Sequence, residues 1–318
     1  MLYRRSGNSG VLLPEISLGM WHNFGCLTPY EISRAIVLTA FEFGITHFDL
    51  ANNYGPEPGA AESFMGNMMR SDLCAHRDEL FISTKAAYDM WEGPYGSWAS
   101  RKHLIASLNQ SLKRMNLEYV DLFYCHRYDP NTPLDETLQT LVDVVRQGKA
   151  LYVGLSRWPL LAACYGFKYL KDRDVPCLIY QGRLNLLDQT PLQDGILRQC
   201  YEDGVGFISF SPLAQGLLTD RYLNGIPEDS RIANDPRFLK ADALTPERMK
   251  QLWALNDIAV QRGENLSTMA LAWILQQRGV TSVIVGASSP EQLKKNLKAT
   301  ESAAFSTEEI QQINKLTQ

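Results

Sequence analysis

Short apolar runs alternate along this chain with longer stretches of mixed polarity. Eight of the runs, most of them about four residues long, predict buried β-strands bounded by polar or turn-forming residues. These runs cover residues 17–18, 45–48, 80–83, 120–124, 152–155, 178–180, 207–209 and 283–285.

Amphipathic helices are predicted between most of the strands. In residues 29–43, for example, Ile32, Ala35 and Ile36 recur three and four residues apart, which is the spacing of one helix face. Gly44 follows at once and is a common helix terminator. The same reasoning predicts helices near 101–115, 133–147, 191–203 and 247–262.

The alternation of strand and helix indicates a parallel sheet. Eight such units favour closure into a (β/α)8 TIM barrel over an open doubly wound sheet. A Rossmann fold is also disfavoured because no Gly-x-Gly-x-x-Gly motif follows the first strand. We therefore expect an α/β protein in which residues 1–318 form a single barrel domain.

Two additions to the plain barrel are predicted. Residues 3–5 and 11–13 flank a Gly- and Ser-containing turn at 6–10, which predicts an N-terminal β-hairpin that plugs the barrel floor. The segments 86–100 and 214–246 are longer than usual βα loops, so they are candidates for function at the C-terminal face.

Composition narrows the class of protein. A chain of 318 residues with 45% hydrophobic and 21% charged residues is typical of a soluble globular protein. The net charge of −4 and the scattered Lys and Arg argue against nucleic-acid binding. No signal-peptide core and no run of about 18 apolar residues is seen, so we expect a cytoplasmic protein without membrane insertion. The six cysteines lack metal-ligand spacing and are expected to be reduced thiols, with no metal site.

Chemically active residues follow several predicted strands. Asp49 closes one apolar run, with Tyr54 just beyond it, and Lys85 and His126 close two others. Because the carboxyl ends of barrel strands meet at one face, we expect these side chains to converge.

This set of residues suits the reduction of a carbonyl group. A lysine ammonium near the Tyr54 hydroxyl would lower the pKa of the phenol, and Asp49 would keep Lys85 charged and oriented. His126 could orient a substrate oxygen as a neutral imidazole donor. Each residue alone has an ordinary structural explanation, but their joint position at three strand ends favours catalysis. Schiff-base chemistry at Lys85 is a rival that Asp49 argues against, because that chemistry needs a neutral amine.

These residues resemble the aldo-keto reductase superfamily. The resemblance rests on Asp49-Leu-Ala-Asn-Asn-Tyr54, Lys85, Tyr124-Cys-His126, Gly154-Leu-Ser156 and the segment Ser211 to Leu218. Within the superfamily, the chain is most similar to bacterial L-glyceraldehyde 3-phosphate reductases and to voltage-gated potassium channel β-subunits. The stretches 88–96 and 111–121 point to the reductases, whereas 156–158 resembles the β-subunits.

The resemblance implies a role for many residues. Tyr54 would be the proton donor, Lys85 and Asp49 its tuning pair, and His126 the orienting residue. NADP would be the cofactor, and a homo-oligomer is implied as well. The positions that match the cofactor site of the superfamily are Trp21, Ser156, Arg157, Gln181, Phe210, Ser211, Pro212, Leu213, Gly216, Leu217, Arg221, Gly286, Ser288, Gln292 and Asn296.

Within this cofactor site, the resemblance assigns different parts of the nucleotide to different residues. Ser156, Arg157 and Gln181 would hold the nicotinamide carboxamide, and Phe210 would pack on its ring. The loop from Ser211 would close over the pyrophosphate, and the helix that opens after Gly286 would receive the 2′-phosphate.

Four positions depart from the pattern of the superfamily. Ser289 and Lys295 stand where relatives often carry an arginine and a glutamate, which bears on the preference for NADP over NAD. Gly182 and Arg183 differ from the usual Gln-x-x-Tyr-Asn stretch, which bears on the substrate range.

Two functions remain open from the sequence. The first is NADPH-dependent reduction of small or phosphorylated aldehydes, such as glyceraldehyde 3-phosphate and methylglyoxal. Trp21, Tyr88, Trp91 and, less directly, Trp98 would wall the substrate pocket, and Arg127 or Arg157 would meet a substrate phosphate. The second is a redox-sensing regulatory module that binds NADP(H), as in the channel β-subunits.

Overall fold

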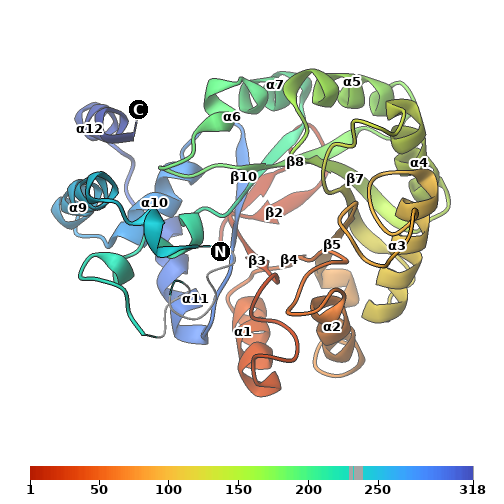
Figure 1. The fold of residues 1–318 in the computed structure, drawn as a ribbon, viewed down its shortest axis with the longest axis horizontal. Coiled ribbons are helices and arrows are strands. Elements are labelled where there is room, and N and C mark those ends of the chain that lie inside the picture. The colour runs from red at the N-terminus through yellow and green to blue at the C-terminus, as the bar shows by residue number, and fades with distance from the viewer. Residues whose placement is uncertain (229–231, 233–238, 318) are drawn as a thin grey trace.

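The computed structural model describes residues 1–228, 232 and 239–317, and its centre is a closed parallel barrel (Figure 1). The strands follow the order β10-β3-β4-β5-β6-β7-β8-β9 around the barrel. The predicted (β/α)8 barrel is therefore confirmed. Its strands are β3 (Ile16–Gly19), β4 (His47–Asp49), β5 (Phe81–Ala86), β6 (Val120–Cys125), β7 (Ala150–Ser156), β8 (Cys177–Arg183), β9 (Gly206–Phe210) and β10 (Val280–Val285).

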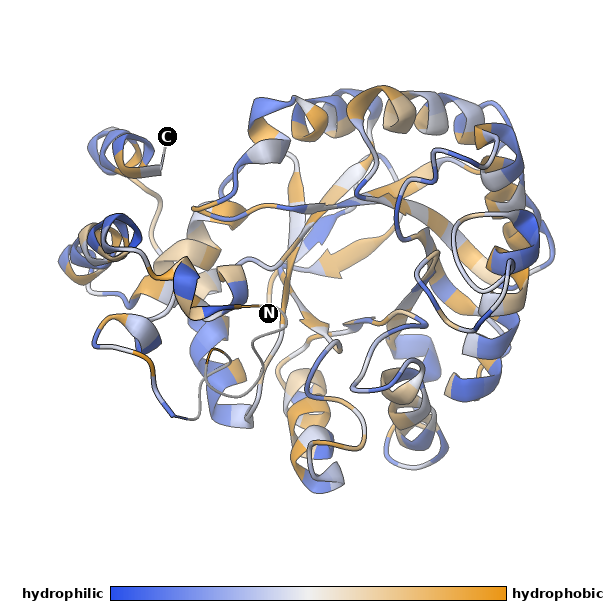
Figure 2. Ribbon diagram, viewed as in Figure 1, coloured by the Kyte–Doolittle hydropathy of each residue, from blue (hydrophilic) through white to orange (hydrophobic). Residues whose placement is uncertain are grey.

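Helices surround the barrel, and most of them carry both apolar and polar residues, as the mixed orange and blue ribbons of Figure 2 show. In α4, for example, the buried residues include Leu138, Leu141 and Val142, whereas the charged residues of its first turn face outward. The helices are α1 (Tyr30–Glu42), α2 (Ala60–Arg70), α3 (Arg101–Met115), α4 (Leu134–Arg146), α5 (Leu160–Lys171), α6 (Thr190–Gln193), α7 (Ile196–Asp203), α9 (Pro246–Gln261), α10 (Leu266–Leu275), α11 (Pro290–Leu297) and α12 (Thr307–Thr317).

The helix predicted over 191–203 is wrong in one respect. The structure divides it into α6 and α7, because Gly195 adopts a left-handed conformation with φ of 85° and ends the first turn. Asp194 stabilises the new start by accepting a hydrogen bond from the Ile196 amide at 2.9 Å.

The N-terminal hairpin closes the floor of the barrel, as predicted. Strands β1 (Tyr3–Arg5) and β2 (Leu12–Pro14) pair antiparallel. Val11 and Leu13 pack against the apolar residues of the barrel interior. Arg4 ties the hairpin to the barrel by donating to the Glu15 carboxylate at 2.7 Å and to the Val280 carbonyl at 3.3 Å.

Long loops leave the opposite, C-terminal face. One joins β5 to α3, and another follows β9 and contains the short 3-10 helices η2 (Ala214–Gly216), η3 (Asp220–Tyr222) and η4 (Ala241–Ala243). Residues 229–231 and 233–238 of the predicted 214–246 excursion lie outside the described part of the chain. Among the described helices, none combines the length and apolar character needed to cross a membrane.

His47 should make stability depend on pH. It lies fully buried inside the barrel on β4, and burial is the main cause that lowers its pKa to about 4. Between that value and the ordinary 6.5, the unfolded chain binds more protons at this position than the folded one, so stability falls as the pH is lowered through this window.

The expected contribution is about 3 kcal/mol at pH 4 relative to pH 7. Urea unfolding of the wild type and of His47→Gln at both pH values measures it. The wild type should lose more free energy of unfolding than the variant. Equal losses would show that His47 does not titrate in this way.

Candidate active site

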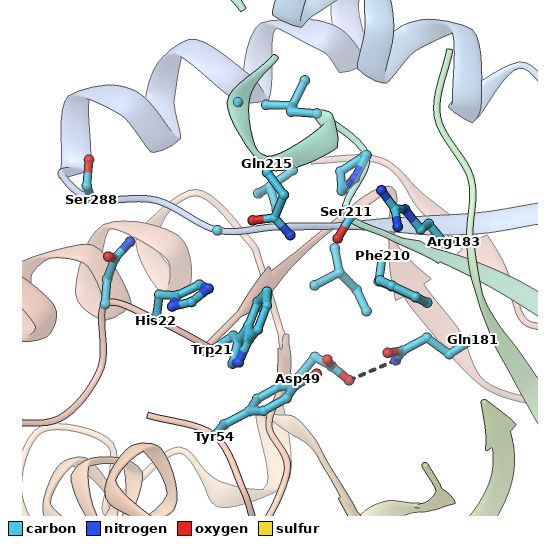
Figure 3. Close-up of a pocket in the computed structure, with 18 of the residues that line it drawn as sticks. Trp21, His22, Asp49, Tyr54, Gln181, Arg183, Phe210, Ser211, Gln215 and Ser288 are labelled. Carbon is cyan, nitrogen blue, oxygen red and sulfur yellow. Dashed lines mark hydrogen bonds between the residues drawn. The ribbon is translucent and has the colours of Figure 1, made fainter. Parts of the chain in front are cut away.

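A large pocket opens where the barrel strands end, at the C-terminal face. Its volume is about 1100 Å³, and it is lined by residues from the ends of most barrel strands and from the loops that follow them (Figure 3). Asp49, Tyr54 and His126 lie on its wall, so the structure brings these predicted residues together.

Lys85 lies beneath this wall on β5 and is completely buried. Its ammonium donates to the Asp49 carboxylate at 2.6 Å and to the Leu50 carbonyl at 2.7 Å. It also donates to the Tyr54 hydroxyl at a longer 3.4 Å. A buried charge needs such partners, since an unpaired ammonium would be strongly destabilising.

Asp49 links this lysine to the opposite side of the barrel. One carboxylate oxygen accepts from Lys85, and the other accepts from the Ser83 hydroxyl at 2.9 Å and from the Gln181 amide at 3.1 Å. The bond to Gln181 is the dashed line in Figure 3. The carboxylate is therefore fixed by donors from β5 and β8, and it presents a defined edge to Lys85.

Tyr54 is held in the turn between β4 and α2. Its amide donates to the Ala51 carbonyl at 3.0 Å, and its own carbonyl accepts from the Ala61 amide at 3.2 Å. This backbone pairing positions the ring above Lys85, whose ammonium lies 4.6 Å from the ring centroid.

The expected lowering of the Tyr54 pKa is wrong for this structure. Burial, followed by the charge of Asp49 and the ring of Tyr88, raises the pKa of Tyr54 well above its usual value, while Arg157 opposes the shift. Burial outweighs the Lys85 ammonium, which lies 3.4 Å from the hydroxyl and is placed to stabilise a phenolate once the proton has left. The phenol is therefore protonated at neutral pH, which is the form that a proton donor requires.

His126 stands beside the two tyrosines. Its ring centroid lies 5.7 Å from that of Tyr54 and 4.6 Å from that of Tyr88. Burial, and then the charges of Lys85, Arg157 and Arg127, lower the pKa of His126 well below its usual value. A neutral imidazole can donate one hydrogen bond to a carbonyl oxygen placed near the Tyr54 hydroxyl.

The predicted cofactor residues form most of the remaining wall. Of that set, only Leu217 and Asn296 do not reach the surface of the pocket, and both are buried beside it. The Ser156 hydroxyl has no hydrogen-bond partner among the described residues although it is buried. At Gly286, an added Cβ would meet only one protein atom, at 4.0 Å, so this backbone is open to a ligand. These features fit a nucleotide whose polar groups would complete the wall.

The start of α11 has the polar groups expected of a phosphate site. The Ser289 hydroxyl caps this helix by accepting from the Gln292 amide at 3.2 Å. The Ser288 amide and hydroxyl donate to the Gln292 side chain at 2.7 and 2.9 Å. Lys295, further along this helix, forms an ion pair with Asp220 at 3.0 Å, which joins α11 to the loop after β9.

The predicted substrate wall is only partly assembled. Trp21 and Tyr88 line the pocket, and the Arg157 guanidinium donates to the Tyr88 hydroxyl at 3.2 Å. Trp91 does not line the pocket and packs on His103, with 4.9 Å between the two ring centroids.

Arg127 does not reach the pocket either. Its guanidinium carbon lies 3.8 Å from the ring centroid of Trp98 and 4.4 Å from that of Tyr88. It also donates to the Ala87 carbonyl at 3.1 Å and to the Ser97 hydroxyl at 2.9 Å. Arg127 therefore stabilises the loop that carries Tyr88, which leaves Arg157 as the nearer arginine for a substrate anion.

Several wall residues were not predicted as site residues. They come from the loops after β3 and β9, whose positions at strand ends were the available signal, and from the residues on either side of Tyr54. They include His22, Asn23, Asn53, Pro56, Pro58, Gln215, Thr219 and Tyr222. Arg183, noted only as a departure, also lines the pocket and forms an ion pair with Asp188 at 3.2 Å.

Comparison with known proteins agrees with this geometry. Two relatives, from Escherichia coli O157:H7 and strain K12, are L-glyceraldehyde 3-phosphate reductases that are 53% and 52% identical, over 99% of this chain and 92% of theirs. A probable voltage-gated potassium channel subunit beta from Oryza sativa subsp. japonica is 33% identical, over 98% of this chain and 94% of its own. The sequence model of the Aldo/keto reductase family matches residues 15–318. A barrel with this pocket at its C-terminal face, matched over almost its whole length, shows that the chain belongs to the aldo/keto reductase family of NAD(P)H-dependent oxidoreductases.

Proposed function

We propose that the protein reduces small or phosphorylated aldehydes with NADPH, and that Tyr54 supplies the proton. The observation that carries this proposal is the contact of the Tyr54 hydroxyl with buried Lys85 at the wall of the pocket. The rest of the same pocket has room and open polar groups for a dinucleotide. The names of the relatives that are more than half identical, L-glyceraldehyde 3-phosphate reductases, support the phosphorylated substrate.

The residues of this chain would act on the carbonyl oxygen of the aldehyde. Tyr54 and His126 donate hydrogen bonds to that oxygen and orient the carbon toward the nicotinamide part of the wall, near Phe210. Bound NADPH supplies the hydride. As negative charge develops on the oxygen, the Tyr54 proton moves to it, and the Lys85 ammonium stabilises the phenolate that remains.

Arg157 is the expected contact for an anionic group on the substrate. Replacing it by alanine should lower kcat/KM for glyceraldehyde 3-phosphate about 10- to 100-fold, since a hydrogen bond to a charged group is lost. The loss for unphosphorylated glyceraldehyde and methylglyoxal should be smaller. Initial rates of NADPH consumption with the three aldehydes measure this, and exposed Arg198→Ala on α7 is the matched control. Equal losses for all three aldehydes would contradict a phosphate contact.

The cofactor preference can be tested separately. NADPH should bind at least about 10-fold more tightly than NADH, a difference of about 1.4 kcal/mol, because the start of α11 offers donors to a 2′-phosphate. Ser288→Ala should weaken only NADPH, whereas Arg221→Ala, beside the expected pyrophosphate, should weaken both cofactors. Fluorescence titration gives the dissociation constants. Equal or tighter binding of NADH by the wild type would rule out the preference.

The similarity to a probable potassium channel subunit beta, at 33% identity, supports a second candidate function, which the same assays can test. Tight retention of NADPH without multiple turnover of any aldehyde would favour the redox-sensing module over the reductase.

A further inference from the structure

Four buried polar side chains form a strip across the interior of the barrel. They are Ser282 on β10, Ser17 on β3, His47 on β4 and Ser83 on β5, and each is fully buried. The two serine hydroxyls of β10 and β3 lie 2.7 Å apart, and Ser17 lies 2.8 Å from Nδ1 of His47. Nε2 of His47 lies 3.0 Å from the Ser83 hydroxyl, which donates to Asp49 at 2.9 Å.

The proton positions in this strip follow from its last bond. An ionised Asp49 can only accept, so the single hydroxyl hydrogen of Ser83 is committed to it. Ser83 must then accept from Nε2 of His47, which therefore carries the imidazole proton. Nδ1 is left as an acceptor and takes the hydroxyl hydrogen of Ser17. Ser17, whose own hydrogen is used, then accepts from Ser282 at 2.7 Å, a closer partner for that hydroxyl than the Glu15 carbonyl at 3.2 Å, so the donors of the strip point toward Asp49.

This order requires a neutral His47. Around it stand the hydroxyls of Ser17 and Ser83, the Phe81 ring, whose centroid lies 5.5 Å from that of His47, and the charges of Asp49 and Lys85. Burial outweighs the attraction of Asp49 and keeps the pKa of His47 near 4, so the ring is neutral at physiological pH. A charged imidazole would instead donate from both nitrogens and reverse the bonds of Ser17 and Ser282.

We propose that His47 is a positioning residue of the reductase, which acts on Asp49 through Ser83. By donating to Ser83, His47 fixes the direction of the serine hydroxyl, and the aligned donors strengthen one another in the low-dielectric interior. Ser83 then holds the carboxylate oxygen that does not face Lys85, and this fixes the other oxygen against the ammonium below Tyr54. The proposal rests on the function proposed above, in which Lys85 stabilises the Tyr54 phenolate.

The strip should therefore affect the chemical step and leave ligand binding unchanged. None of its members lines the pocket, so none can contact an aldehyde or a cofactor. Losing the strip should lower kcat with unchanged KM and unchanged NADPH affinity. It should also change the kcat–pH profile, because the bonds that hold the Asp49 carboxylate against Lys85 are altered.

The test compares kcat, KM and the kcat–pH profile of the wild type, His47→Leu, Ser83→Ala, the double variant and His47→Gln. We expect His47→Leu and Ser83→Ala each to lower kcat about 10-fold, as one weakened bond to a charged group would. The double variant should match Ser83→Ala, because His47 acts only through Ser83. His47→Gln, which keeps a donor and an acceptor, should recover most of the loss. Ile208→Val removes a methyl from the apolar half of the same interior and is the packing control.

Several results would overturn the proposal. They are a wild-type kcat and kcat–pH profile in His47→Leu, a loss in the double variant equal to the product of the single losses, or no recovery by His47→Gln. If His47→Leu does not fold, Ser83→Ala and His47→Gln decide, and a wild-type profile in Ser83→Ala overturns the proposal. Tyr54→Phe is assayed beside them. Retained turnover in that variant would refute the part of the proposed function that makes Tyr54 the proton donor, whereas its loss together with normal His47 variants would refute only the positioning role.

Discussion

Replacing Tyr54 by phenylalanine is expected to lower kcat for every aldehyde at least about 100-fold, because general acids contribute roughly 100- to 10,000-fold to such reactions. The ring and its packing against Trp21 and His126 remain in the variant, so the pocket keeps its shape. Only the hydroxyl that contacts Lys85 at 3.4 Å is lost. The dissociation constant of NADPH should stay within about threefold of the wild type, since the loss concerns the proton.

Single-turnover rates with premixed NADPH measure this effect without interference from product release. Tyr169→Phe is a matched control, because it removes a phenol hydroxyl that bonds to Gln139 on the outer helices. A Tyr54→Phe variant with more than a tenth of the wild-type rate would assign the proton to another donor, and His126 would be the first residue to consider.

The barrel and the reactive residues could be predicted from the sequence because both are marked by patterns among residues that are neighbours in the chain. Asp49, Lys85 and His126 each follow a short apolar run, and parallel strands that close into a barrel must bring such ends to one face. Helix α5 was harder to predict. Leu161 and Tyr165 are exposed while Ala163 and Gly166 are buried, so its apolar residues do not mark one face.

Contacts between segments far apart in the sequence explain the other differences. Arg127 directly follows His126, and its position alone suggested a place in the pocket. Its side chain instead packs against Tyr88 and Trp98 from the preceding loop, which no local pattern records. The pKa of Tyr54 was misjudged for a related reason: the sequence showed a lysine partner but not the depth at which the phenol is buried, which outweighs that partner.

The buried pair itself should be the most sensitive point for stability. Lys85→Met removes a fully buried ammonium and leaves the Asp49 carboxylate without its counter-charge. Breaking such a pair from one side typically costs about 3–5 kcal/mol of unfolding free energy. The bonds from Ser83 and Gln181 remain and keep the carboxylate partly satisfied. Turnover should be lost together with stability, because no cation remains to stabilise the Tyr54 phenolate.

Urea unfolding can separate the unpaired charge from the change of packing. In the Asp49→Asn/Lys85→Met double variant, the charge is removed from both partners, so the double variant should be more stable than Lys85→Met alone. A deficit that the second substitution does not reduce would mean that the lysine stabilises the barrel through packing of its aliphatic chain. In that case its bond to Asp49 would serve catalysis alone.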